Sequence, residues 1–176
     1  MKLKRFHRYL LPLAALSLLP TVASAFDYNY LEGGYLHRDN DQVDESGFRI
    51  AGSVNVVPNL AVIAGYGDTG NYDRIDAGAL FHTPLNPTLD LVAGATLEHA
   101  EFHHDDDTGI GLRGGVRWQL LPALEIDPEL RYVDVFGGMT SARVGALYRI
   151  NPALYVQGAV QAGDEDRAEV GLRYAF

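Results

Sequence analysis

SGFRIAGSVNVV, residues 46–57, alternates strictly between two kinds of side chain. Phe48, Ile50 and Val54 fall on one face of an extended chain, whereas Arg49 and other polar or small residues fall on the opposite face. A period of two over a dozen residues predicts a β-strand with one apolar face and one polar face. The stretch therefore predicts a sheet whose two faces meet different surroundings.

The same alternation recurs along the chain and predicts about ten strands. We expect them near residues 27–38, 46–57, 60–68, 72–83, 89–102, 108–120, 124–135, 140–150, 154–163 and 167–176. These lengths suit tilted strands that cross a bilayer. The predicted fold is all-β, an antiparallel up-and-down transmembrane β-barrel; eight strands, with one hairpin folded outside the membrane, is the alternative.

Connecting segments of two kinds separate the strands. Compact turns with Pro occupy residues 57–60, 86–89, 121–124 and 151–154, and looser segments rich in Gly and acid occupy 39–46, 68–71, 103–109, 137–140 and 164–167. Short turns at one end and longer polar loops at the other are typical of outer-membrane barrels, and an even strand count places both termini at the Pro-turn end. Pro128 lacks an N–H, so we expect a bulge there or exposure of the partner carbonyl to water.

The polar faces carry a balanced set of charges. Eight arginines and eight carboxylates occupy the alternate strand positions that face away from the apolar stripes; we call residues of one strand that point to the same face residues of the same parity. The charged residues are Glu32, Arg49, Arg74, Asp76, Asp90, Glu98, Arg113, Arg117, Glu125, Asp127, Glu129, Arg131, Arg143, Arg149, Glu169 and Arg173. A ten-stranded barrel is little wider than one that side chains fill. We expect an ion-paired, mostly plugged lumen; a solvated polar face without specific pairs is the alternative.

Aromatic residues gather near the two predicted ends of the strands. Tyr35, Phe48, Tyr66, Tyr72, Phe102 and Phe136 lie toward the loops, and Phe81, Trp118, Tyr148, Tyr174 and Phe176 lie toward the turns. Amphipathic rings favour the headgroup level of a membrane, so two girdles predict a membrane barrel. A soluble sandwich is the alternative, but it has no need of balanced charges on its wet face.

Residues 1–25 form a predicted signal peptide, and 26–176 the barrel. A basic start is followed by a short apolar run and by Ala23-Ser24-Ala25, which is typical of an export signal and too short for a membrane helix. The remainder has ten arginines against 23 acidic residues, a net charge of −13, and no Cys. This composition excludes disulfides and argues against nucleic acid as a partner.

Two segments resemble known families. Residues 28–35, YNYLEGGY, followed by an acidic loop and Gly47-Phe48, resemble small outer-membrane barrels once proposed as a secreted immune elicitor or quorum signal. Gly33-Gly34-Tyr35 is also similar to barrels of the outer-membrane protein X type. The end of the chain, with Tyr174 and Phe176, resembles the signal read by the outer-membrane assembly machinery. The resemblance brings no catalytic residues.

One cluster could form a site. Its members are His99, His103, His104, Asp105, Asp106 and Asp107. Such groups can bind a divalent cation, or with His37 serve a rim enzyme, but the spacing matches no defined ligand order and short loops make little pocket. We expect a solvated acidic loop, no metal or cofactor, and no enzyme.

The expected function is a structural or surface-interaction role in the bacterial outer membrane, reached by export. The alternatives are a narrow cation-leaning channel, whose selectivity would come from the lumenal charges, and, less favoured, a rim-located enzyme. The expected partners are outer-membrane lipids and lipopolysaccharide, periplasmic chaperones and the assembly machinery. The chain is expected to be a monomer.

Overall fold

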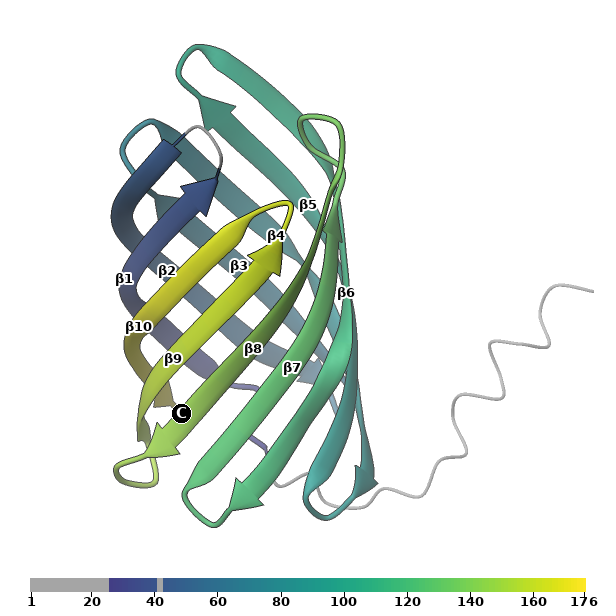
Figure 1. Cartoon of the computed structure of the whole chain (residues 1–176). Coiled ribbons are helices and arrows are strands. Elements are labelled where there is room, and N and C mark those ends of the chain that lie inside the picture. Colours follow the sequence, from purple (N-terminus) through teal and green to yellow (C-terminus); the bar gives the residue numbers. More distant parts are fainter. Residues whose placement is uncertain (1–25, 41–42) are drawn as a thin grey trace, which may run out of the picture.

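The computed structural model describes residues 26–40 and 43–176, and the predicted signal peptide lies outside these residues. The described chain forms one closed antiparallel barrel (Figure 1). Its strands are β1 (Tyr30–Asn40), β2 (Val43–Val57), β3 (Leu60–Asp68), β4 (Tyr72–Asn86), β5 (Leu89–Phe102), β6 (Asp105–Leu121), β7 (Leu124–Val133), β8 (Met139–Arg149), β9 (Leu154–Gly163) and β10 (Asp166–Ala175). The prediction of ten strands is confirmed, and the eight-stranded alternative is wrong.

Each strand pairs with its neighbours in sequence, and β1 pairs with β10 to close the ring. The closing seam runs without a break from Tyr30 opposite Ala175 to Asp39 opposite Asp166. A closed ring leaves no unpaired sheet edge. No helix among the described residues is long and apolar enough to cross a membrane.

The two ends of the barrel differ in their connections, and we call them the turn end and the loop end. The turn end holds the four Pro-containing connections and the last residue, whereas the loop end holds the acidic connections (Figure 1). Strands continue into segments expected as loops: β2 begins at Val43 and β6 at Asp105, so 39–46 and 103–109 are largely strand. Most described residues of these segments thus belong to paired strands, with Asn40 opposite Val43 and Phe102 opposite Asp105.

Pro128 produces a gap in the ladder and no bulge, so of the two outcomes expected there the bulge is wrong. The register of β7 against β8 is regular through Pro128. Pairing of β7 with β6 stops at Gly115 opposite Glu129 and resumes in the same register at Trp118 opposite Ile126. The missing proline N–H removes a hydrogen bond without inserting a residue.

Large apolar side chains cover the outside of the barrel. Leu97, Leu130 and Val160 are each more than 60% exposed, which is the reverse of a soluble protein, where such residues are buried. Charged residues of the strands instead face the interior, where Glu98 is 0% exposed. The alternation seen in the sequence is thus apolar outside and polar inside, as in transmembrane barrels.

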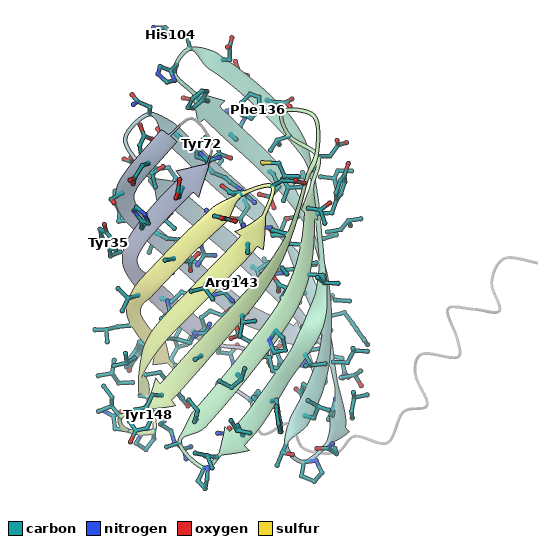
Figure 2. The ribbon with its side chains drawn as sticks, viewed as in Figure 1. Tyr35, Tyr72, His104, Phe136, Arg143 and Tyr148 are labelled. Carbon is teal, nitrogen blue, oxygen red and sulfur yellow. The ribbon has the colours of Figure 1, made fainter. Side chains whose placement is uncertain are left out.

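Exposed aromatic rings lie toward both ends of this apolar surface. Tyr35 and Phe136 are on the outer surface in the loop half, and Tyr148 is at the turn end (Figure 2). Tyr72 and Phe102 were predicted to belong to the loop-end girdle, and this is wrong. Both have the parity of inward residues and pack inside the barrel.

Candidate functional site: the barrel interior

Nine arginines and nine carboxylates of the described chain face the interior. The arginines are Arg38, Arg49, Arg74, Arg113, Arg117, Arg131, Arg143, Arg167 and Arg173, and the carboxylates are Glu32, Asp76, Asp90, Glu98, Glu125, Asp127, Glu129, Glu165 and Glu169. The equal numbers make the interior neutral overall. A buried charge is costly unless it is paired, so this balance is a requirement for filling the barrel with ionic side chains.

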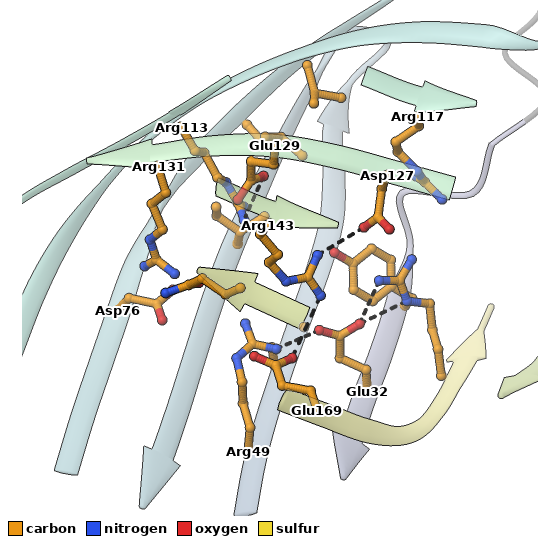
Figure 3. Close-up of a pocket in the computed structure, with 18 of the residues that line it drawn as sticks. Glu32, Arg49, Asp76, Arg113, Arg117, Asp127, Glu129, Arg131, Arg143 and Glu169 are labelled. Carbon is orange, nitrogen blue, oxygen red and sulfur yellow. Dashed lines mark hydrogen bonds and ion pairs between the residues drawn. The ribbon is translucent and has the colours of Figure 1, made fainter. Parts of the chain in front are cut away.

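A first group of ion pairs, the inner network, lies around Glu32 of β1 (Figure 3). Glu32 accepts from Arg49 Nη1 of β2 at 2.7 Å and from Arg173 Nη2 of β10 at 2.7 Å. Arg143 of β8 extends the network, with Nη1 at 3.2 Å from Asp127 and Nη2 at 3.7 Å from Glu169. These contacts join strands on both sides of the closing seam.

Arg113 is the more loosely held member of this region. Its Nη1 lies 3.8 Å from Glu129 Oε2, which exceeds hydrogen-bond distance. Its Nε is buried and has no hydrogen-bond partner in the structure. The interior is therefore not uniformly satisfied, because Arg173 donates to Glu32 from both Nε and Nη2, whereas Arg113 Nε has no hydrogen-bond partner.

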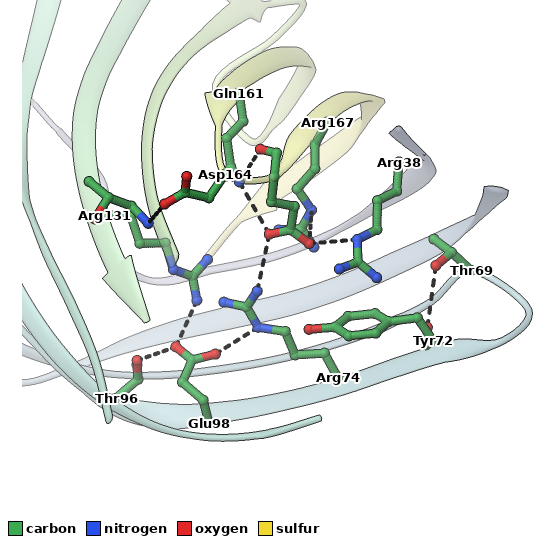
Figure 4. A network of polar contacts seen from close by, with 12 residues as sticks. Arg38, Thr69, Tyr72, Arg74, Thr96, Glu98, Arg131, Gln161, Asp164 and Arg167 are labelled. Atoms are coloured by element: carbon green, nitrogen blue, oxygen red, sulfur yellow. Dashed lines mark hydrogen bonds and ion pairs between the residues drawn. The ribbon is translucent and has the colours of Figure 1, made fainter. Parts of the chain in front are cut away.

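A second group of ion pairs, the outer network, lies toward the loop end and is built on two glutamates (Figure 4). Glu98 of β5 accepts from Arg74 Nε and from Arg131 Nη2, each at 2.7 Å. Glu165, in the connection from β9 to β10, lies 2.8 Å from Arg38 Nε. Because Arg74 Nη1 also reaches Glu165 at 3.4 Å, one arginine links both glutamates.

Aromatic and amide groups complete the outer network. The Arg38 guanidinium carbon lies 3.5 Å from the centre of the Tyr72 ring, a cation–π contact. Gln161 Nε2 donates to the Glu165 backbone carbonyl at 3.1 Å. Tyr72 faces inward, on the same side of β4 as Arg74. It provides this contact and also packs in an apolar cluster with Ala100, Val133 and Val135.

Inward glycines provide room for two of the buried carboxylates. A Cβ on Gly111 of β6 would overlap the Glu98 carboxylate, and a Cβ on Gly145 of β8 would overlap that of Asp127. Alanine at either position would therefore have to displace a carboxylate from its arginine partners. These strand glycines serve close approach of a side chain, a common use of Gly inside sheets.

Residues 26–29 enter the barrel at the turn end. Tyr28 is 1% exposed and Phe26 is 8% exposed, and both pack against Ile63, Leu80 and other inward apolar residues of β3 to β5. Arg117 of β6 holds this segment, because its Nη1 donates to the Asp27 carbonyl at 2.8 Å. Phe26 and Tyr28 have the same parity as Glu32, so the sequence could have indicated that both side chains point inward.

Two small cavities lie among the inward-facing side chains. The central cavity has a volume of about 80 Å³ and is lined by residues of the inner network, by Tyr28 and by Arg131, Gln161 and Arg167. A turn-end cavity of about 20 Å³ is lined by Phe26, Arg149 and their neighbours. Volumes of this size hold a few water molecules.

The sequence-predicted lumen residues lie inside the barrel with one exception. Arg149 is at the turn-end mouth with an exposed side chain, where it donates to the Pro122 carbonyl. The prediction omitted Arg38 and Arg167, although parity with Glu32 and Glu169 could have found them. Glu165 lies in a turn, where strand alternation gives no signal.

The candidate metal ligands at the loop end do not converge. Among the described residues, no three His or carboxylate groups could hold a metal ion together. His99 Nδ1 contacts Thr108 Oγ1 at 2.8 Å, and Asp107 accepts from the Phe136 N–H at 2.6 Å. His103 and His104 form the connection from β5 to β6, where Asp105 and Asp106 begin the next strand with exposed side chains.

Comparisons with known proteins show the fold. No protein-family model matches the sequence, and no curated protein does either. The KdgM porin in complex with disordered oligogalacturonate is 14% identical with a TM-score of 0.52, over 84% of this chain and 99% of that one. The NanC porin is 9% identical with a TM-score of 0.51, over 84% and 100%.

An outer-membrane channel from Pseudomonas putida F1 is also similar, with 9% identity and a TM-score of 0.51 over 90% of this chain and 100% of that one. At these identities the likeness is one of architecture. The chain thus shares with these proteins the architecture of a closed β-barrel, which in this chain is antiparallel, up-and-down and ten-stranded.

Proposed function

We propose that this chain is a bacterial outer-membrane protein, exported by means of residues 1–25, with a structural or surface-interaction role and a lumen largely closed to solutes. The exposed apolar side chains around the barrel support a membrane location, because water would not tolerate so large an apolar surface. The similar solved structures are porins and an outer-membrane channel, which supports the same location.

The filling of the interior is the observation that carries the proposed closure. Ion-paired side chains occupy the middle, the segment with Phe26 and Tyr28 occupies the turn end, and the cluster with Tyr72 and Val133 occupies the loop end. The central cavity of about 80 Å³ is too small for a sugar. This argument favours a barrel that does not transport nutrients.

The proposed partners follow from the outer surface. Exposed aromatic rings such as Tyr35 and Tyr148 suit lipid headgroups, including lipopolysaccharide on the outer leaflet. Tyr174 and Phe176 project outward from the last strand, where the assembly machinery and chaperones could bind them before the seam closes. We propose a monomer, because every strand edge is already used within one chain.

A narrow channel is the second candidate. The two cavities share Arg117 and Arg173 in their linings, so they lie next to each other along the barrel. The names of the similar structures also favour this candidate. The interior charges balance, so any passage would have little selectivity by net charge.

Single-channel recording separates the two candidates. The refolded chain is added to a planar lipid bilayer in 1 M salt. KdgM porin, which has a similar barrel and is named as a porin, is the positive control. We expect no discrete current steps from this chain under conditions in which KdgM porin gives them. Regular steps at all applied voltages would reject the closed lumen and favour the channel.

A further inference from the structure

The turn end contains a site that is built around a phenol ring. The ring of His82 from β4 stacks on the ring of Tyr28 with centroids 3.6 Å apart and planes 12° from parallel. The Tyr28 hydroxyl donates to Asp90 Oδ2 of β5 at 2.9 Å. Arg117 of β6 lies over the same ring, with its guanidinium carbon 4.5 Å from the centroid. We call His82, Asp90 and Arg117 the phenol-binding site.

The elements that form this site are not the neighbours of β1. Tyr28 precedes β1, which pairs with β2 and β10, whereas the site belongs to β4, β5 and β6 across the interior. The barrel walls thus form the site, and the chain's own N-terminal segment fills it. The contacts are of the kinds that recognise an aromatic ring and its hydroxyl: stacking, cation–π and a charged acceptor.

The occupied site also borders the central cavity on the side of the turn end. Tyr28 lines the central cavity, and Phe26 lines the smaller cavity nearer the mouth. Arg117 lines both and is fixed by Glu125, whose Oε2 lies 3.0 Å from its Nη2. Removing the Tyr28 ring would therefore leave a path from the mouth to the inner network.

We propose that Tyr28 is an intramolecular ligand: it fills the phenol-binding site, and a free phenol can take the place of its side chain. While the site is filled, the central cavity is closed at the turn end. When the site is empty, solvent and small reagents reach the cavity from that end. This role does not depend on which side of the membrane the turn end faces, or on whether ions pass through the loop end.

Cysteine labelling tests the proposal, because the chain has no native Cys. Ala51 of β2 is buried and lines the central cavity, and Thr88 is exposed in a turn at the turn end. Ala51→Cys reports access to the cavity, and Thr88→Cys is the matched control for reagent and detergent. The purified barrel is treated with a small charged thiol reagent, and the labelled fraction is followed by mass spectrometry.

We expect Ala51→Cys to react much more slowly than Thr88→Cys. Combining Tyr28→Gly with Ala51→Cys should raise the rate of thiol labelling at least about tenfold. A tenfold change corresponds to about 1.4 kcal/mol in the equilibrium between the closed and the open cavity. The phenol p-cresol, which copies the tyrosine side chain, should restore slow labelling. Toluene has the same ring without the hydroxyl and should protect less, and Tyr28→Phe should stay close to wild type.

Three results would overturn the proposal. They are equal labelling of Ala51→Cys and Thr88→Cys in the parent chain, no acceleration by Tyr28→Gly, and equal protection by p-cresol and toluene. Circular dichroism checks that each variant is folded. If Tyr28→Gly does not fold, Tyr28→Ala takes its place, since alanine also leaves the site empty for p-cresol.

Discussion

Replacing Arg117 by alanine should strongly destabilise the barrel. Arg117 is 8% exposed, and its guanidinium contacts Glu125 through two nitrogens, donates to the Asp27 carbonyl and lies over the rings of Phe26 and Tyr28. Removing one partner of a buried ion pair costs about 3 to 5 kcal/mol, because the other charge stays buried without it. We expect a loss in the free energy of unfolding within this range.

Urea unfolding in lipid vesicles measures the loss. Trp118 is the single tryptophan and lies exposed on the outer surface, so its fluorescence changes when it leaves the lipid. With a urea dependence of about 2 kcal/mol per molar, a loss of 3 to 5 kcal/mol lowers the midpoint by roughly 1.5 to 2.5 M.

Arg149→Ala is the matched control. Arg149 lies at the same end of the barrel, is exposed, and donates to one carbonyl. Its removal should cost less than about 1 kcal/mol, the value for exposed polar contacts. If Arg117→Ala and Arg149→Ala shift the urea midpoint equally, Arg117 does not hold the N-terminal segment inside the barrel, and the reasoning fails.

Three further predictions concern the wall, the last residue and a glycine. Leu112→Arg places a charge near the middle of β6 on the lipid side and should cost about 2 to 4 kcal/mol in the same urea assay; full tolerance would mean that the inner and outer faces are reversed. Removing Phe176 should lower the yield of protein in the outer membrane, measured by fractionation and immunoblot, far more than Phe136→Ala does, and equal yields would contradict an assembly role. Gly111→Ala should displace the Glu98 carboxylate and lower the thermal unfolding midpoint by several degrees in circular dichroism, whereas an unchanged midpoint would show that the outer network adapts freely.

Strand alternation predicted the fold well because successive side chains of a strand point alternately to the outside and to the inside of the barrel. The lipid outside requires apolar residues and the interior accepts polar ones, so the sequence alternates with a period of two. Residues 46–57 and the similar stretches carry apolar side chains toward lipid and polar ones inward, so strand number and face could be read together. Ion pairing inside followed from equal numbers of Arg and carboxylate residues. The individual partners could not be predicted, since Arg74 reaches both Glu98 and Glu165 across strands distant in sequence.

Two errors share one cause. Tyr72 was assigned to a lipid-facing girdle because aromatic residues favour interfaces, yet its parity with Arg74 places it inside. Phe102 was assigned in the same way, yet it has the parity of Glu98 and packs inside the barrel. In both cases the backbone period, which is a geometric constraint, outweighed a residue-type preference. The role of Glu165 was beyond prediction, because turns have no fixed period.

The position of Tyr28 fixes an order of events during refolding. Its partners Asp90 and Arg117 lie 62 and 89 residues further along the chain and belong to strands that must first stand in a wall. Local hairpins such as β5 and β6 can form early, because closing short loops loses little entropy. The N-terminal segment can consequently dock only after β4, β5 and β6 have paired, and a chain caught before that step would have an open turn end.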